Sequence, residues 1–328
     1  MAATSAPARA PKDFRALTRK GPSKRKPRLC IIGQEGVGKT TAGAESPKPV
    51  FICSEDGLIG PQFEGMDLES YGPETWEDVL DYLEYLRTSD HDRETIIFDT
   101  ADWLEMMVHR YVIARDRTNE KGNPLASIED YGFGKGEVIA ADEFKKLLQR
   151  LEHLQQTKNM MVILLCHCTV RNFKNPEGED YERFEGKLGR RVMALVKEWC
   201  DGVLFAHYET HTHKDKQTKR VKGLGGKTRI MECNHSAAWD AKNRFGLPDG
   251  LPFDMATLLN AIENGNGAGG SSEDLVATIQ ELIQQIPEEK HAAIEAAIAG
   301  AKGEAAALSH VLNRVRTTIA NMENTTNG

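Results

Sequence analysis

The eight residues from Gly33 to Thr40 read G-Q-E-G-V-G-K-T, and their types and spacing suit the binding of a triphosphate. Glycines let the backbone curl so that successive N–H groups point at phosphate oxygens, and the N-terminus of a following helix reinforces the attraction. The lysine of such a motif reaches the β- and γ-phosphates, and the next hydroxyl is a ligand for Mg²⁺. We therefore predict that ATP and Mg²⁺ are bound here, by Gly33, Gln34, Glu35, Gly36, Val37, Gly38, Lys39, Thr40 and Thr41.

Polar side chains at the ends of three other apolar segments could complete the site. Asp99 ends T-I-I-F-D, where a P-loop enzyme usually holds its magnesium ion through water, so we predict Thr40 and Asp99 as the metal residues. Glu55 follows V-F-I-C, at the sheet edge where ligands of open α/β folds collect, and is our candidate base for the attacking water. His167 follows M-V-I-L-L-C and could report the state of the γ-phosphate.

Other metal sites are disfavoured by the residue pattern. Cys166, His167 and Cys168 are consecutive, and consecutive residues of a strand point to opposite faces, so the three cannot all face one ion. His211 and His213 share a face and could bind a metal, but two histidines alone are a weak signal.

The elements that must position these residues follow from the apolar segments. Six short, continuous apolar segments are typical of strands buried on both faces of a mainly parallel sheet. They span residues 29–32, 50–53, 95–98, 161–166, 202–206 and 229–233. Apolar residues recur at helical spacing over 76–86 and 144–154. The β-α-β order predicts a three-layer α/β fold.

Composition divides the chain into four parts. Residues 1–27 are rich in Ala, Pro, Lys and Arg and predict a basic, disordered arm. Residues 28–263 should form the ATPase core, and N-G-N-G-A-G-G-S-S at 264–272 reads as a flexible linker. Residues 273–328 predict a small helical domain from their alanine-rich helical segments.

Charge and hydropathy restrict the partners. The net charge of −7 argues against a protein coated in nucleic acid, although the arm and residues 214–229 are basic and could contact phosphates. No apolar stretch approaches the roughly 18 to 20 residues needed to cross a bilayer, so we expect no membrane partner and a cytoplasmic location.

At this point the layout resembles the RecA-type ATPase core. More narrowly, residues 28–252 are similar to phage ATPases of the Sak single-strand annealing group, fourth type. The motifs are G-x-x-G-x-G-K-T-T, P-K-P-V-F-I-C-S-E-D-G, D-Y-G-F-G-K-G (130–136) and A-K-N-R-F-G-L-P (241–248). The resemblance implies that the strand ending at His167 lies between the phosphate-loop strand and the Asp99 strand. It also implies a bacteriophage source and the cytoplasm of an infected bacterial host.

In RecA-type cores the segments after the third and fourth strands are DNA-binding loops, which match residues 115–137 and 170–189 here. The second segment interleaves cations with aromatic rings, a pattern that suits single-stranded DNA because bases stack on rings while cations follow the backbone. The candidate DNA contacts are Arg171, Phe173, Lys174, Arg183, Phe184 and Lys187. The alternative is an exposed loop whose aromatic residues pack inward.

The A-K-N-R segment resembles the K-x-R element with which RecA-like motors and filaments reach a neighbouring subunit's nucleotide. Lys242 and Arg244 would then stabilise the transferred phosphate's charge in trans, and the active ATPase would be a homo-oligomer, either a ring or a filament. Surface charge is the alternative explanation of the two residues.

The expected function is that of an ATP-dependent, single-stranded DNA-binding recombination protein that promotes annealing or strand exchange. We predict a Mg²⁺-dependent, DNA-stimulated ATPase, with single-stranded DNA and other copies of the chain as partners and a single-strand-binding protein as a further candidate. Three alternatives stay open: a RecA-type ring helicase or helicase loader, a small-molecule P-loop kinase, and a nucleotide-driven assembly switch without turnover.

Overall fold

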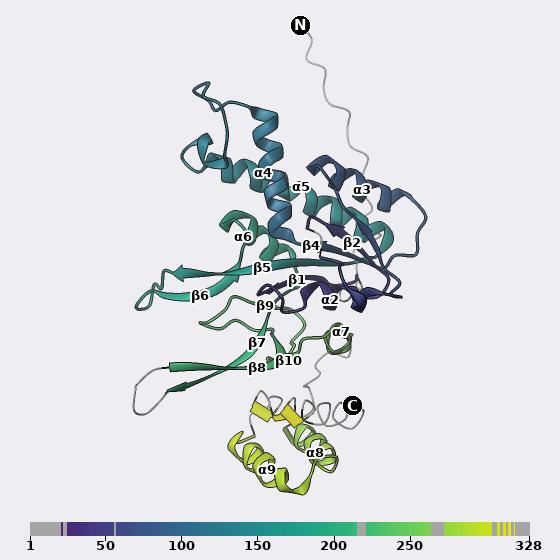
Figure 1. Ribbon diagram of the computed structural model, residues 1–328, viewed down its shortest axis with the longest axis vertical. Helices are drawn as coiled ribbons and strands as arrows, with labels where there is room; N and C mark the ends of the chain where they lie inside the picture. Colours follow the sequence, from purple (N-terminus) through teal and green to yellow (C-terminus); the bar gives the residue numbers. More distant parts are fainter. Residues whose placement is uncertain are drawn as a thin grey trace.

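The computed structural model describes residues 21, 25–55, 57–214, 221–263 and 272–303, and single helical residues between 307 and 318 (Figure 1). Its centre is a sheet with the strand order β10-β8-β7-β1-β5-β4-β2-β3, in which β6 also pairs with β5 and β9 with β7. The strands are β1 (Arg28–Gly33), β2 (Pro49–Cys53), β3 (Glu69–Tyr71), β4 (Thr95–Asp99), β5 (Met161–Phe173), β6 (Tyr181–Gly186), β7 (Gly202–Lys214), β8 (Val221–Glu232), β9 (Lys242–Asn243) and β10 (Leu251–Pro252).

Helices cover both faces of this sheet. The α-helices are α2 (Lys39–Ala44), α3 (Trp76–Thr88), α4 (Ala101–Asp116), α5 (Lys135–Lys158), α6 (Arg190–Trp199), α7 (Met255–Glu263), α8 (Ser272–Ile283) and α9 (His291–Gly300), and the 3-10 turns are η1 (Pro61–Phe63), η2 (Ile128–Tyr131) and η3 (Glu288–Lys290). Buried side chains of α3, α4, α5 and α6 form one core with the sheet, and those of α2 and α7 form the other. The result is the predicted three-layer RecA-like α/β core.

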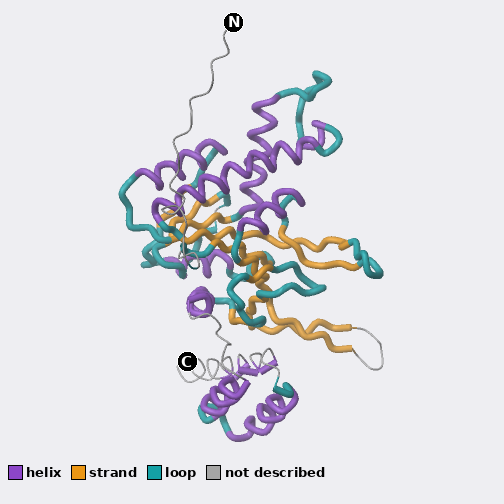
Figure 2. Tube along the Cα trace, turned by 180° about the vertical axis from the view of Figure 1, so that it is seen from behind, coloured by secondary structure: helices purple, strands orange, loops and turns teal. Residues whose placement is uncertain are grey.

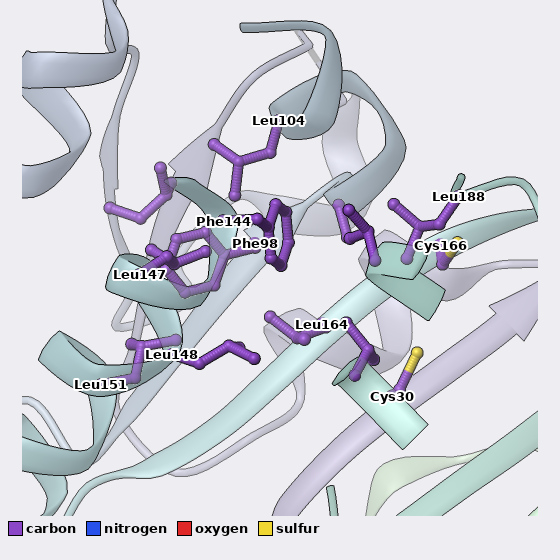
Figure 3. Close-up of a cluster of buried hydrophobic side chains, with 14 of the residues drawn as sticks. Cys30, Phe98, Leu104, Phe144, Leu147, Leu148, Leu151, Leu164, Cys166 and Leu188 are labelled. Atoms are coloured by element: carbon purple, nitrogen blue, oxygen red, sulfur yellow. The ribbon is translucent and has the colours of Figure 1, made fainter. Parts of the chain in front are cut away.

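Alternation along β1 shows why its sequence is continuously apolar. Cys30 and Ile32 belong to the core under α3–α6, whereas Leu29 and Ile31 belong to the core on the α2 side, and all four are fully buried. Successive strand residues point to opposite faces, so a strand covered on both sides has no position that water reaches. The same pattern holds in β4 and β5. Figure 3 shows Phe98 and Leu164 from these strands beside helical Phe144 and Leu147.

The parallel register brings the strand ends of the predicted site together. Strands β7, β1, β5, β4, β2 and β3 are mutually parallel. Gly33 at the end of β1 pairs with His167 on β5, and Asp99 at the end of β4 pairs with Leu165 on β5. Cys53, just before the segment that carries Glu55, pairs with Asp99. The strand that carries His167 therefore lies between the β1 and β4 strands, as the resemblance implied.

All six predicted strands occur, and both predicted helical stretches fall inside α3 and α5. The segment 170–189, expected as a loop, is instead largely a hairpin in which β5 continues to Phe173 and returns as β6. Both this hairpin and the β7–β8 hairpin extend from the carboxyl edge of the sheet, which Figure 2 shows from behind. Helices α4 and α6 are additions that the sequence patterns did not identify.

The predicted small helical domain is present as α8, α9 and further helical residues, with a buried cluster of its own that includes Leu275, Ile279 and Leu308. Most of the predicted arm and residues 264–271 of the predicted linker lie outside the described residues. Within the arm, Arg25 pairs with Asp201 at 2.6 Å and Lys26 pairs with Glu94 at 2.6 Å. None of the helices in the described part is long and apolar enough to span a bilayer.

The tight packing of α5 on the sheet leads to a stability prediction. Leu147 is fully buried, so Leu147→Ala should lower the free energy of unfolding by about 2–5 kcal/mol, because it loses apolar burial and leaves a cavity. Urea denaturation measures the change. Val138→Ala on the same helix is the matched control, since Val138 is 41% exposed and should change stability by less than about 0.5 kcal/mol. Equal effects of the two changes would contradict the packing described here.

Candidate nucleotide site

The phosphate loop lies between β1 and α2, and its backbone requires glycine. Gly38, the residue before α2, has φ of 98°, a left-handed conformation that side chains rarely adopt. Gly33 lies against β7, where an added Cβ would be 2.7 Å from the carbonyl oxygen of Ala206. Lys39 is buried and its Nζ donates to the carbonyl oxygens of Gly33 (3.0 Å) and Gln34 (2.9 Å), so it curls over the loop. Burial lowers the pKa of Lys39, and the nearby Asp99 carboxylate opposes that shift.

The two predicted metal residues are in direct contact. Thr40 Oγ1 donates to Asp99 Oδ2 at 2.7 Å. Asp99 is almost completely buried, and burial raises its pKa, while the bond from Thr40 and the charge of Lys39 act in the opposite direction. Beside this pair lies Gly57, where a Cβ would be 3.0 Å from Asp99 Oδ2 and 3.3 Å from Thr40 Oγ1. A hydroxyl and a carboxylate beside a glycine, at a position where a side chain would crowd them, fit a hard cation such as Mg²⁺. The sequence analysis did not identify Gly57.

His167 and Glu55 also lie at this edge. The Nδ1 atom of His167 is 2.9 Å from Asp102 Oδ2, and its backbone N–H donates to Asp102 Oδ1 at 3.0 Å. The Nε2 atom of His167 lies 3.8 Å from Glu55 Oε1, and Glu55 keeps 30% of its side chain exposed. Asp102 thus fixes the imidazole ring so that its other nitrogen faces Glu55. The sequence analysis missed Asp102, although it stands in the first turn of the helix that follows Asp99.

The carboxylates of this group have opposite pKa shifts. Burial raises the pKa of Glu55, and the nearby His167 partly offsets the rise. Burial would also raise the pKa of Asp102, but the hydrogen bonds from the side chain and backbone of His167 together lower it. Glu55 is therefore the better proton acceptor of the two, because a base with a raised pKa holds a proton more readily.

The base of the β5–β6 hairpin is tied to the same group of residues. The N–H of Lys187 donates to the carbonyl oxygen of His167 at 2.8 Å, and the N–H of Gly189 donates to Glu105 Oε2 at 2.8 Å. Arg171 Nη2 donates to the Leu188 carbonyl oxygen at 2.7 Å. Burial raises the pKa of Glu105 to about 7, although the bond from Gly189 lowers it in part. The hairpin is consequently anchored one helical turn from Asp102, on α4.

The predicted DNA contacts divide into outward and inward side chains. Lys187 is exposed, as is Lys174, which pairs with Asp180 at 2.5 Å. The rings of Phe173 and Tyr181 are 5.2 Å apart at the far end of the hairpin. An open cavity of about 310 Å³ separates the hairpin from α6. Its lining has the cations Arg171, Lys174, Arg183, Arg190 and Lys197 and the carboxylates Glu185 and Asp240, which pair with Arg183 and Lys197.

Two of the six candidate contacts, Arg183 and Phe184, have side chains that pack against the body of the chain. Arg183 lies 4.1 Å from the centre of the Phe173 ring and bonds to Glu185 at 2.7 Å, with only 10% of its side chain exposed. Phe184 stacks on Phe205 at 5.2 Å and joins the core. These two side chains stabilise the hairpin and do not offer free surface to a base.

The predicted finger residues lie at the opposite edge of the sheet from the phosphate loop. Strand β9 pairs Lys242 with Val203 at the start of β7, whereas Gly33 pairs with Ala206 further along that strand. Lys242 Nζ donates to three carbonyl oxygens at the end of α6, including that of Cys200 at 2.8 Å, so it is occupied within its own chain. Arg244 is 55% exposed and its Nη1 lies 3.5 Å from Asp201 Oδ1.

Other metal sites are not supported. In the described part of the chain no group of three or more His, Cys, Asp or Glu side chains could hold a metal ion. The side chains of His211 and His213 lie outside that part. The six cysteines are free thiols, four of them buried.

The loop, the Thr40–Asp99 pair and the strand order define a P-loop nucleotide-binding protein with a RecA-like core. A family model described as the AAA domain matches residues 25–245, and the chain belongs to this family. Among solved structures, the crystal structure of the RadB recombinase aligns with a TM-score of 0.37 and 13% sequence identity, over 69% of this chain and 86% of that one. So distant a likeness carries no functional conclusion. None of the curated proteins matches the chain.

The raised pKa of Glu105 predicts a pH-dependent stability. Between about pH 4.5 and 7 the folded state keeps a proton on Glu105 that the unfolded chain loses, so this group's contribution to stability falls as pH rises. Glu105→Gln removes the charge and keeps an acceptor for Gly189. The variant should therefore be more stable than the parent at pH 8, by up to about 3 kcal/mol, and the difference should shrink at pH 5.

Thermal or urea unfolding at the two pH values measures this difference. Glu182→Gln is the matched control, because Glu182 is exposed on the β5–β6 hairpin that Glu105 anchors, and this variant should keep the pH dependence of the parent. A Glu105→Gln protein that is less stable than the parent at pH 8 would show that the buried carboxylate is stabilising.

Proposed function

We propose that this chain is an ATP-dependent, single-stranded DNA-binding recombination protein that promotes annealing or strand exchange and hydrolyses ATP at subunit interfaces. The observation that carries the proposal is strand β5. It holds His167 at the phosphate site and continues into the basic, aromatic hairpin. One rigid element thus connects the place where a γ-phosphate would lie with the place where a DNA strand would lie.

The nucleotide chemistry follows from the side chains at the carboxyl edge. The loop amides and Lys39 would bind the phosphates, and Thr40 and Asp99 would hold Mg²⁺, whose charge neutralises the phosphate oxygens. Glu55 would accept the proton of the attacking water, because it is partly exposed and its pKa is raised. His167, oriented by Asp102, would sense the γ-phosphate from beside Glu55.

The DNA contacts are proposed for the outward residues of the hairpin. Lys174 and Lys187 are exposed cations that would follow the phosphate backbone, and the cavity beside Arg171 adds positive charge. The ring of Phe173 at the hairpin's end could stack a base. Arg183 and Phe184 would act indirectly, by holding the hairpin in shape.

Hydrolysis in trans is proposed for Arg244. The Arg244 side chain is more than half exposed. The adjacent Asn243 pairs with Gly202 on β7, four residues before Ala206, which pairs with Gly33; at about 3.3 Å per residue this is about 13 Å along the strand. Arg244 thus follows a strand at the amino edge of the sheet, whereas its own phosphate loop is at the carboxyl edge, so we propose that it serves a neighbour's loop. Lys242 would support it by fixing the segment to α6.

Other functions use parts of the same site. A ring helicase or helicase loader would share the finger and the oligomer, and unwinding of a duplex distinguishes it from a protein that only anneals. A small-molecule kinase would transfer phosphate independently of DNA, with arginines such as Arg171 and Arg190 as a clamp. A nucleotide-driven assembly switch would bind ATP and oligomerise without turnover.

The assignment of Glu55 as the base predicts a specific loss. Glu55→Gln should reduce DNA-stimulated ATP hydrolysis by about 100-fold or more, because the attacking water loses its proton acceptor, while ATP binding persists. Steady-state hydrolysis with and without single-stranded DNA measures turnover, and a fluorescent ATP analogue measures binding. Glu64→Gln is the control, since Glu64 is exposed and outside the site. Turnover that DNA does not change would remove the recombination assignment.

The trans arrangement predicts complementation between two inactive proteins. Arg244→Ala keeps an intact phosphate loop and Lys39→Ala keeps an intact Arg244, so an equal mixture should restore complete sites at about one interface in four. ATP hydrolysis of the mixture, at concentrations where light scattering shows assembly, measures the recovery. A mixture as inactive as either protein alone would exclude Arg244 as a finger in trans.

A further inference from the structure

The outer side of the phosphate loop is in contact with the β7–β8 hairpin. Tyr208 on β7 donates a hydrogen bond from its Oη to the carbonyl oxygen of Gly36 at 2.9 Å. Arg229 on β8 donates from Nη1 to the carbonyl oxygen of Val37 at 3.4 Å. The two bonds reach consecutive peptide groups of the loop.

These two side chains form one unit. Tyr208 and Arg229 are directly opposite each other in the β7–β8 ladder, next to the register shift that follows Tyr208. The carbonyl oxygen of Arg229 also accepts from the N–H of Phe253, so its backbone is held on both sides. The positions from which the two donors act are therefore fixed by the sheet itself.

We propose that Tyr208 and Arg229 are positioning residues for the triphosphate, which clamp the phosphate loop in its binding conformation. A trans peptide group is planar, and its C=O and N–H point in opposite directions. A donor on the Gly36 carbonyl turns the N–H of Val37 the other way, and a donor on the Val37 carbonyl does the same for the N–H of Gly38. The clamp thus turns these two amides away from the hairpin and toward the inside of the loop. The N–H of Val37 donates there to the carbonyl oxygen of Gln34 at 3.4 Å, and a bound phosphate oxygen would replace that acceptor.

This contact is a second reason, besides the positive φ, why residue 38 is glycine. A Cβ on Gly38 would collide with the Arg229 guanidinium, so only glycine lets the arginine approach the loop this closely. Along the sequence, Tyr208 lies about 170 residues after its partner Gly36, and Arg229 lies about 190 residues after its partner Val37. The phosphate-binding unit therefore consists of the loop together with one rung of the β7–β8 hairpin.

The test rests on the proposed nucleotide binding and compares Tyr208→Phe and Arg229→Gln with the parent. Each change should weaken the binding of a fluorescent ATP analogue by about 3- to 10-fold, the effect of one lost hydrogen bond, and the double change by more. KM for ATP should rise with little change in kcat, because the loop still closes once nucleotide is bound. Arg229→Lys, which keeps a donor, should recover part of the affinity.

A second ligand distinguishes a clamp on the phosphate loop from a direct contact of Tyr208 and Arg229 with the nucleotide's base. The affinity for inorganic tripolyphosphate, measured by competition, should fall by the same factor as the affinity for ATP, because the clamp acts on the phosphate loop alone. Tyr85→Phe is the matched control, because Tyr85 is exposed on α3 and should leave both affinities unchanged. Thermal unfolding of the nucleotide-free proteins should give midpoints within a few degrees of the parent, the effect of one lost hydrogen bond in an intact fold.

The outcomes are distinguishable. A parent that binds neither ATP nor tripolyphosphate would overturn the proposed nucleotide binding and the clamp together. A parent that binds both, with Tyr208→Phe and Arg229→Gln within twofold of it, would overturn the clamp alone. A loss confined to ATP, with tripolyphosphate unaffected, would also overturn the clamp and assign the two side chains to the base or sugar.

Discussion

The parallel pairing of β5 with both β1 and β4 is the constraint on which the site depends. Because β5 lies between them, the ends of three strands meet, and they deliver the phosphate loop, His167 and Asp99 to one edge. Helices also cover both faces of β5, and residues from Met161 to Cys166 are at most 3% exposed. Burial of β5 on both faces stabilises the sheet, and the sheet in turn positions the phosphate loop, His167 and Asp99 at one edge.

Burial also sets the electrostatics of this edge. The sheet and α4 remove solvent from Asp99, Asp102 and Glu105, and each carboxylate responds according to its partners. Asp102 receives two hydrogen bonds from His167 and stays acidic, whereas Glu105 receives one backbone N–H and does not. Similar burial therefore yields different protonation, and the number of donors decides between them.

Much of the core could be predicted from sequence because its signals are local. A glycine-rich motif between an apolar strand and a helix can be recognised without knowledge of distant contacts, and so can Glu55, Asp99 and His167 at or just after the ends of continuous apolar segments. The features that were missed depend on tertiary contacts. Asp102 resembles any acidic residue in a first helical turn, and only the fold shows that it holds His167.

The basic and aromatic segment illustrates the same limit. Composition alone gave no reason to separate its six residues, but Phe184 on β6 packs against the core and stacks on Phe205, whereas Lys187, just past the end of β6, stays exposed. Lys242 and Arg244 likewise stand two residues apart, yet one caps the end of α6 and the other extends outward. The spacing was visible in the sequence, and the helix terminus that binds Lys242 was not.

The placement of the phosphate loop and Arg244 at opposite edges of one sheet gives the subunit a head and a tail. If copies associate head to tail and Arg244 acts in trans as proposed, the interface is heterologous, and the shape of the assembly determines how many sites are complete. In a closed ring every nucleotide site would have a neighbour's Arg244. In an open chain of copies, the phosphate loop at one end would have no neighbouring Arg244, and Arg244 at the other end would have no neighbouring phosphate loop. The two ends would therefore differ chemically and could grow or shorten at different rates.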